Sequence, residues 1–166
     1  MIMPDMAGEA ILQEVDHPHT FRVINSFLKK CEGAMVLIDA AKLREGGQSQ
    51  EFFTMKLISY LAELTDEAKR GWAKKPVAMV LTKADQCEEC ADDPARFAQA
   101  HASGLWQQCS ERLQQHRFFA AGVAGACAYR QSLTEGRVYV PLRVEPHGII
   151  EPFEWLLSKL AAGGRR

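Results

Sequence analysis

The chain has 166 residues, 47% of them hydrophobic, which is enough for one domain with a sizeable buried core. Its 20 basic and 21 acidic side chains nearly cancel, which argues against a nucleic acid or an anionic membrane as partner. Five cysteines, an odd number, and the lack of an apolar leader predict a reducing, cytoplasmic setting. The apolar runs are far shorter than the roughly 20 residues that span a bilayer, so we expect no membrane insertion.

Four segments have the composition of strands. Residues 34–40 and 76–81 are continuous apolar runs without alternation, as in strands that are covered on both faces. Residues 117–122 form a third such run. Residues 136–142 alternate and contain a proline, which is typical of an edge strand or of one arm of a hairpin.

Helical patterns lie between these strands, with apolar residues three and four positions apart on one face. The predicted helices cover residues 21–31, a segment after Ser49, a segment after Pro94, and residues from about 149 to 162. The expected buried stripes are Phe97, His101, Leu105, Cys109 and Leu113 in the third helix, and Phe153, Leu156, Leu157 and Leu160 in the last. This alternation predicts a three-layer α/β/α fold with a mostly parallel sheet and with ligands at the carboxyl ends of the strands.

The second apolar run is followed directly by Thr82, Lys83 and Asp85, which places a lysine and an aspartate at the carboxyl end of a central strand. An ionised carboxylate accepts two hydrogen bonds at once, which suits the ring N–H and the exocyclic amine of guanine. Adenine has no matching pair of donors. A buried acceptor left unpaired by the wrong base costs about 1–3 kcal/mol or more, so Asp85 could discriminate between purines. Taken alone, Thr-Lys-x-Asp is also common in exposed turns.

The tetrapeptide from Thr82 to Asp85 resembles the Asn/Thr-Lys-x-Asp base-reading motif of the Ras-like P-loop GTPase superfamily. Asp5 and Gly8, followed by a helical pattern, resemble the Asp-x-x-Gly switch motif of the same superfamily, although such a pair also occurs in ordinary turns. The resemblance implies that Asp5 holds Mg²⁺ through a water and that Gly8 donates its backbone N–H to the terminal phosphate. The order of strands, helices and motifs along the chain also matches this superfamily from its third strand onward.

In this superfamily a short Ser-Ala-Lys-like turn follows the next strand and donates a backbone N–H to the guanine carbonyl. The resemblance assigns this role to Gly122 and Val123, although the serine is missing here. A strand-like insertion over residues 134–144, which Ras lacks, then leads to the last helix. Residues 146–152 resemble bacterial double-GTPase relatives more than Ras. We therefore expect a truncated P-loop GTPase fold with an extra strand or hairpin before the last helix.

The resemblance covers only the last two-thirds of the superfamily's domain. The phosphate-binding loop Gly-x-x-x-x-Gly-Lys-Ser/Thr is absent, because no Gly-Lys pair occurs in the chain. Without that loop the phosphates lose their cradle, so we expect no GTP hydrolysis by this chain alone. Glu9 stands where Ras-like enzymes carry the glutamine that orients the attacking water, and phosphates would repel its carboxylate. The missing first strand would leave a sheet edge for the rest of a longer protein, or for another chain, to cover.

Cys87 and Cys90 follow the base motif and could form half of a zinc site, with His101 and Cys109 as later ligands. The sequence favours packing in the core instead, because His101 and Cys109 fall on the apolar face of a predicted helix. A redox role is disfavoured, because the two glutamates between the cysteines would raise the thiol pKa values.

Two functions from different classes fit this sequence. The first is a guanine-nucleotide-binding GTPase domain over residues 1–166, with GTP or GDP and Mg²⁺ as ligands and without its phosphate-binding part. In that domain Thr82, Lys83 and Asp85 contact the base. The second is a degenerate GTPase-like module that binds a protein partner or a second copy through an exposed sheet edge, and binds no nucleotide.

Overall fold

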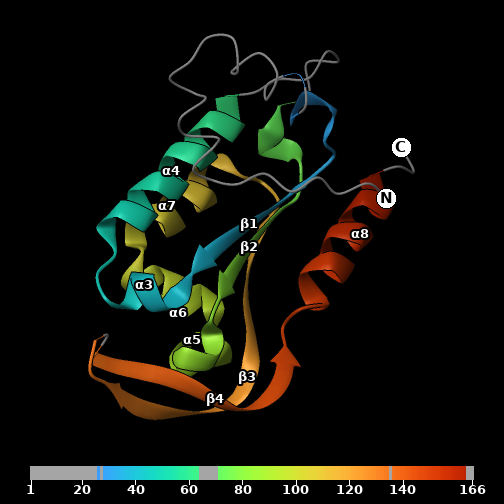
Figure 1. The fold of residues 1–166 in the computed structure, drawn as a ribbon. Helices are drawn as coiled ribbons and strands as arrows, with labels where there is room; N and C mark the ends of the chain where they lie inside the picture. The colour runs from blue at the N-terminus through green and yellow to red at the C-terminus, as the bar shows by residue number, and fades with distance from the viewer. Residues whose placement is uncertain (1–25, 27, 64–70, 135, 164–166) are drawn as a thin grey trace.

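The computed structural model describes residue 26 and residues 28–63, 71–134 and 136–163. This part of the chain is an α/β structure in which a four-stranded sheet, in the order β1-β2-β3-β4, lies between helices (Figure 1). The first three strands of that order are parallel, so the mostly parallel sheet that the sequence predicts is confirmed.

β2 (Val77–Thr82) is the central strand of the parallel part and pairs with β1 (Ala34–Asp39) on one side and with β3 (His116–Ser132) on the other. Its first five residues are buried, which accounts for the apolar run without alternation. β4 (Gly136–His147) pairs antiparallel with the second part of β3 and forms a hairpin before the last helix, where the sequence predicts an extra strand or a hairpin.

β3 is much longer than predicted. The expectation that this strand ends near Gly122 and is followed by a turn is wrong, because it continues to Ser132 and pairs with β4 from Gly122 onward. β4 likewise extends past the predicted insertion to His147. The hairpin gives the backbone N–H and C=O groups of this segment hydrogen-bond partners on the opposite strand. In a turn, many of these groups would need partners elsewhere. Register shifts between Gly122 and Cys127 mark irregular pairing where the hairpin leaves the sheet.

Most helices cover one face of the sheet (Figure 1). They are α3 (Ala40–Arg44), α4 (Gln48–Glu63), α5 (Glu88–Asp92), α6 (Pro94–His101) and α7 (Ser103–Arg112), with the 3₁₀ turns η1 (Trp72–Lys74) and η2 (Ala84–Gln86). The core beneath them includes the fully buried side chains of Ile38, Ile58, Trp72, Met79, Leu81 and Leu105. Leu28 and Cys31, from the end of the predicted first helix, also pack against this core. The larger of the two cores therefore lies on this face.

The predicted helix after Pro94 is two helices, α6 and α7, so the expectation of one continuous helix is wrong. At the break, one carboxylate oxygen of Glu51 on α4 accepts hydrogen bonds from the backbone N–H groups of Gly104 (2.9 Å) and Leu105 (3.2 Å). A carboxylate at a helix N-terminus satisfies free N–H groups and complements the helix dipole, so this contact stabilises the start of α7. The predicted stripe still faces the core, with Phe97, Leu105, Cys109 and Leu113 buried.

α8 (Glu151–Gly163) covers the other face of the sheet, where Trp155 and Leu156 pack against a smaller cluster on β2 and β3. The predicted stripe of this helix is partly wrong, because Leu157 is 47% exposed while Trp155 takes a place against the sheet. Leu37 of β1 points to this face by strand alternation and is 63% exposed. No described helix is both long enough and apolar enough to cross a membrane.

The link between β4 and α8 gives a stability test. Gly148 has φ +66°, and a Cβ placed there would overlap the backbone oxygen of Ala120. Gly46 has φ +82°, but a Cβ there meets nothing within 4 Å. We expect Gly46→Ala to lower the free energy of unfolding by about 1 kcal/mol through backbone strain alone. Gly148→Ala should lower the free energy of unfolding considerably more, as measured by urea unfolding. Equal losses of stability in the two variants would contradict the close packing of Gly148 against Ala120.

Candidate functional site

The carboxyl ends of β1 and β2 lie beside the point where the parallel part of β3 ends, at one edge of the parallel sheet. Asp39 at the end of β1 pairs in register with Thr82 at the end of β2, and Thr82 pairs with Ala121 of β3. Lys83 and Asp85 follow β2 directly, where the sequence places them. This edge is where a parallel α/β sheet is expected to bind a ligand.

Thr82 and Lys83 are both fixed by contacts to β1. The Thr82 hydroxyl donates a hydrogen bond to the backbone oxygen of Ile38 (3.1 Å), so it ties β2 to the neighbouring strand. Lys83 has φ 58°, the one positive φ among non-glycine residues of the described part of the chain. Such a conformation costs of the order of 1–3 kcal/mol and persists only where surrounding contacts hold it. The backbone turn after β2 is therefore a constrained feature of this edge.

Asp39 holds the Lys83 side chain, although the sequence analysis did not select Asp39 as a site residue. The Lys83 Nζ lies 2.6 Å from Asp39 Oδ2, and the other Asp39 oxygen accepts from the backbone N–H of Lys42 (3.1 Å) and caps α3. Burial raises the pKa of Asp39, but the hydrogen bonds and charges of Lys83 and Lys42 outweigh it and lower the pKa below its usual value. Its position at the end of an apolar run was the available signal, because the same argument selected Asp85.

Asp85 lies in η2, and its oxygen Oδ1 is buried without a hydrogen-bond partner among the described residues. The same oxygen lies close to Gly122: a Cβ built on this glycine would be 2.5 Å from Oδ1 and 2.9 Å from the Asp85 backbone nitrogen. Any side chain at position 122 would therefore displace the Asp85 carboxylate. An unpaired buried carboxylate oxygen is unfavourable, and because it is buried against Gly122, a ligand can reach it only if neighbouring residues move.

The structure changes the surroundings expected for Gly122 and Val123. Both lie in β3 instead of in a Ser-Ala-Lys-like turn, and the Val123 side chain is 59% exposed. Gly122 pairs with His147 of β4. The His147 imidazole also lies close to Gly122, since a Cβ built on this glycine would be 2.5 Å from its Cε1 atom. His147 therefore lies beside Asp85. Nothing in the sequence pattern indicated this, because the register of the hairpin determines where His147 falls.

The cysteines after the base motif pack in the core. Cys87, Cys90 and Cys109 are fully buried in the larger hydrophobic cluster. Burial raises the pKa of all three thiols, to about 12 for Cys90 and Cys109, so they stay protonated near neutral pH. Among the described residues no group of three or more His, Cys, Asp or Glu side chains is placed to hold a metal ion. Asp5 and Gly8, to which the resemblance assigns Mg²⁺ and phosphate, lie outside the described residues.

Comparison of the chain with protein-family models, with curated proteins and with solved structures finds no match. The residues and geometry of this edge of the sheet are therefore the basis for assigning a function.

The Asp39–Lys83 pair predicts a pH effect. Because the folded-state pKa of Asp39 is lowered, its ionisation stabilises the fold above the unfolded carboxyl pKa of about 3.9. That contribution is lost as the pH falls through the lower folded-state pKa. Lys83→Met removes the hydrogen bond and the charge, so the Asp39 pKa should rise and the variant should lose less stability on acidification. The control is Lys56→Met, an exposed lysine on α4.

Carbon-13 NMR titration of the Asp39 carboxyl measures its pKa, and urea unfolding at several pH values measures stability. An Asp39 pKa that is the same in the Lys83→Met variant and in the unsubstituted protein would contradict the pairing.

Proposed function

We propose that the carboxyl edge of the parallel sheet binds the base of a guanine nucleotide, with Asp85 as the residue that recognises it. The observation that carries this proposal is the buried Oδ1 of Asp85, which lies directly after the central strand without a hydrogen-bond partner in the described part of the chain. The ring N–H and exocyclic amine of guanine are adjacent donors that an ionised carboxylate can accept together. Adenine has only one of these donors, and its ring nitrogen N1 would place an acceptor beside the other carboxylate oxygen.

The neighbouring residues support this assignment. Asp39 holds the Lys83 ammonium, so the aliphatic part of Lys83 is fixed near the edge where it can lie against a planar base. Thr82 keeps the ends of β1 and β2 together. Gly122 leaves the space that the Asp85 carboxylate occupies. Together they form a prearranged set of contacts for a base, which reduces the entropy that binding must overcome.

The phosphates are the weak part of such a complex. The sequence has no Gly-Lys pair, so a Walker-type loop does not contribute to binding GTP or GDP, and we propose no hydrolysis by this chain alone. In the proposal, Mg²⁺ and the terminal phosphate depend on Asp5 and Gly8 and on an N-terminal phosphate-binding part that this sequence does not contain. The base site can be tested without them.

The second candidate is a GTPase-like module that binds a protein and no nucleotide. The specific observation in its favour is Leu37, which is 63% exposed on the face that α8 covers only in part. β1 is also an edge strand of the described sheet. A second copy or another protein could pair with this edge and cover Leu37.

Titration calorimetry with GDP and Mg²⁺ tests the base site, with ADP as the comparison ligand. We expect binding of GDP and little or none of ADP. Asp85→Ala should weaken GDP binding by about 10–100-fold, since hydrogen bonds to a charged group contribute about 1.5–3 kcal/mol. Asp92→Ala, an exposed carboxylate on α5, is the matched control and should leave binding unchanged.

Identical traces without heat for the unsubstituted protein and Asp85→Ala would contradict the base site and favour the interaction module. Analytical ultracentrifugation then tests that module for the case of a second copy as the partner. A self-association that Leu37→Asp abolishes would support it.

A further inference from the structure

The outer edge of β3 is open along its parallel half. β2 pairs with residues 116–121 of β3 on one side, and β4 begins to pair on the other side only at Gly122. Val77 donates its backbone N–H to the oxygen of Gln115. In a parallel pair, every second residue directs its backbone N–H and C=O groups toward the partner strand, so Gln115 and Arg117 face β2. His116 and Phe118 therefore direct their backbone groups away from β2, where no described strand receives them.

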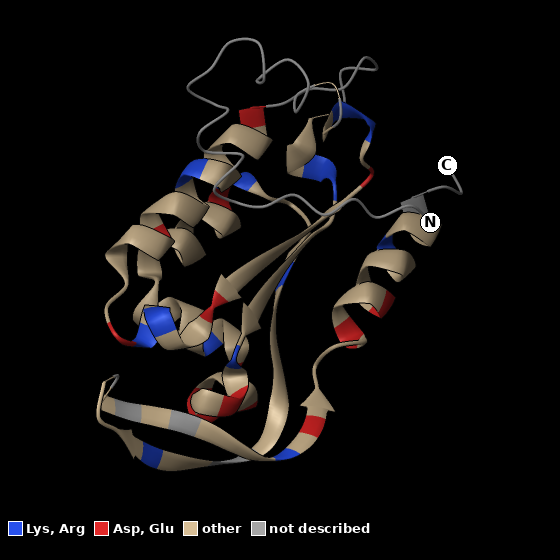
Figure 2. Cartoon of the chain, viewed as in Figure 1, with Lys and Arg blue, Asp and Glu red and all other residues tan. Residues whose placement is uncertain are grey.

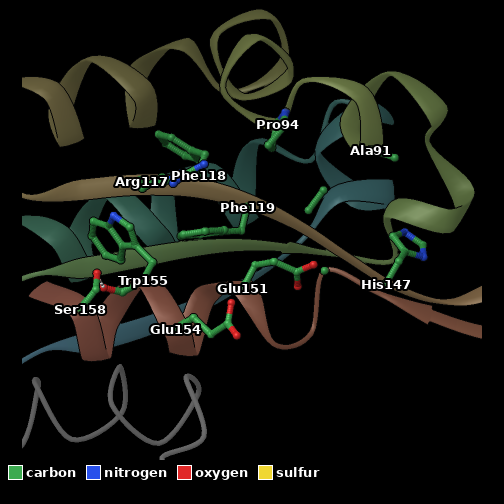
Figure 3. Close-up of a pocket in the computed structure, with 12 residues that line it drawn as sticks. Ala91, Pro94, Arg117, Phe118, Phe119, His147, Glu151, Glu154, Trp155 and Ser158 are labelled. Atoms are coloured by element: carbon green, nitrogen blue, oxygen red, sulfur yellow. Dashed lines mark hydrogen bonds between the residues drawn. The ribbon is translucent and has the colours of Figure 1, made fainter.

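A cavity of about 670 Å³ follows this open edge, and we call it the edge trough. Ala91 and Pro94 line it on the side of α5 and α6, and Trp155 lines it on the side of α8 (Figure 3). Phe118 and Phe119 also line it, but their side chains are buried in cores on opposite faces, with only 6% and 7% of each residue exposed. These two side chains therefore add little surface to the floor of the trough, where the backbone of β3 is the group that an added strand would recognise.

The wall of the trough that α8 forms is acidic. Glu151 and Glu154 line it from the first turns of α8, and acidic residues also lie on α5, on the other side of β3 (Figure 2). Arg117 is the one lysine or arginine among the described lining residues, and its guanidinium lies 5.1 Å from the centre of the Phe119 ring. The Trp155 ring packs edge-on against the same phenyl ring, so an apolar surface lies between the carboxylates and the strand. Such a surface complements side chains with apolar stems and positive ends.

We propose that the edge trough binds an extended, lysine- or arginine-rich segment of a partner polypeptide, which adds to the sheet as a strand beside β3. The backbone of His116 and Phe118 pairs with the segment, and Glu151 and Glu154 pair with its basic side chains. The contact of Gly148 with the Ala120 oxygen closes one end of the trough, so the ladder is short. The proposal is based on the open edge of β3 and the carboxylates of α8 and not on nucleotide binding, although His147, which lies beside Asp85, also lines the trough.

Three synthetic hexapeptides test the proposal with the full chain: alternating Lys and Val, alternating Glu and Val, and the Lys-Val peptide with N-methylated backbone nitrogens. Binding is followed by tryptophan fluorescence and by amide hydrogen exchange. We expect the Lys-Val peptide to bind at millimolar concentration and to slow exchange at Phe118. The Glu-Val and N-methylated peptides should bind at least about tenfold more weakly, because one loses the charge pairing and the other the backbone donors.

The combined Glu151→Gln and Glu154→Gln variant should weaken binding of the Lys-Val peptide several-fold, since each exposed ion pair contributes modestly. Glu63→Gln at the end of α4 removes a charge outside the trough and is the matched control. Circular dichroism checks that the variants are folded. The proposal would be overturned if the Lys-Val peptide did not bind, or if the N-methylated peptide bound as tightly as the unmethylated one. It would also be overturned if the double variant bound the Lys-Val peptide as tightly as the unsubstituted protein does.

Discussion

The arrangement of the site depends on the burial of one strand, β2. Because its first five residues are buried and both neighbouring strands run parallel to it, the ends of β1 and β2 lie level with the end of the parallel part of β3. This brings Asp39, Lys83, Asp85 and Gly122 together from segments that are far apart in the sequence. A substitution that disrupts the packing of β2 would therefore displace these residues, even with their own side chains unchanged.

Two carboxylates at this edge have opposite environments. Asp39 accepts hydrogen bonds from Lys83 and Lys42, which lower its pKa and use its oxygens within the protein. One oxygen of Asp85 is buried without such a partner in the described residues. Asp39 therefore acts as a positioning residue for Lys83, whereas Asp85 has an oxygen whose hydrogen-bonding capacity the described residues leave unused. This difference is the physical basis of the proposed base recognition.

The parallel strands and the position of Asp85 could be predicted because they depend on local patterns: an apolar run without alternation, followed directly by charged residues. Contacts between distant segments could not be predicted in this way. The division into α6 and α7 depends on Glu51 of α4, and the position of His147 depends on the register of the hairpin. Nor did the composition of residues 121–125 show that β3 continues there, because small residues fit a turn and an irregular strand equally well.

The most direct test of the central claim compares two purines that differ at one donor. GDP and IDP carry the same phosphates and ribose, but hypoxanthine lacks the exocyclic amine of guanine. If the Asp85 carboxylate accepts both guanine donors, GDP should bind about tenfold or more tightly than IDP in calorimetric titration, and Asp85→Ala should abolish that difference. Equal affinity for the two nucleotides in the unsubstituted protein would contradict the account.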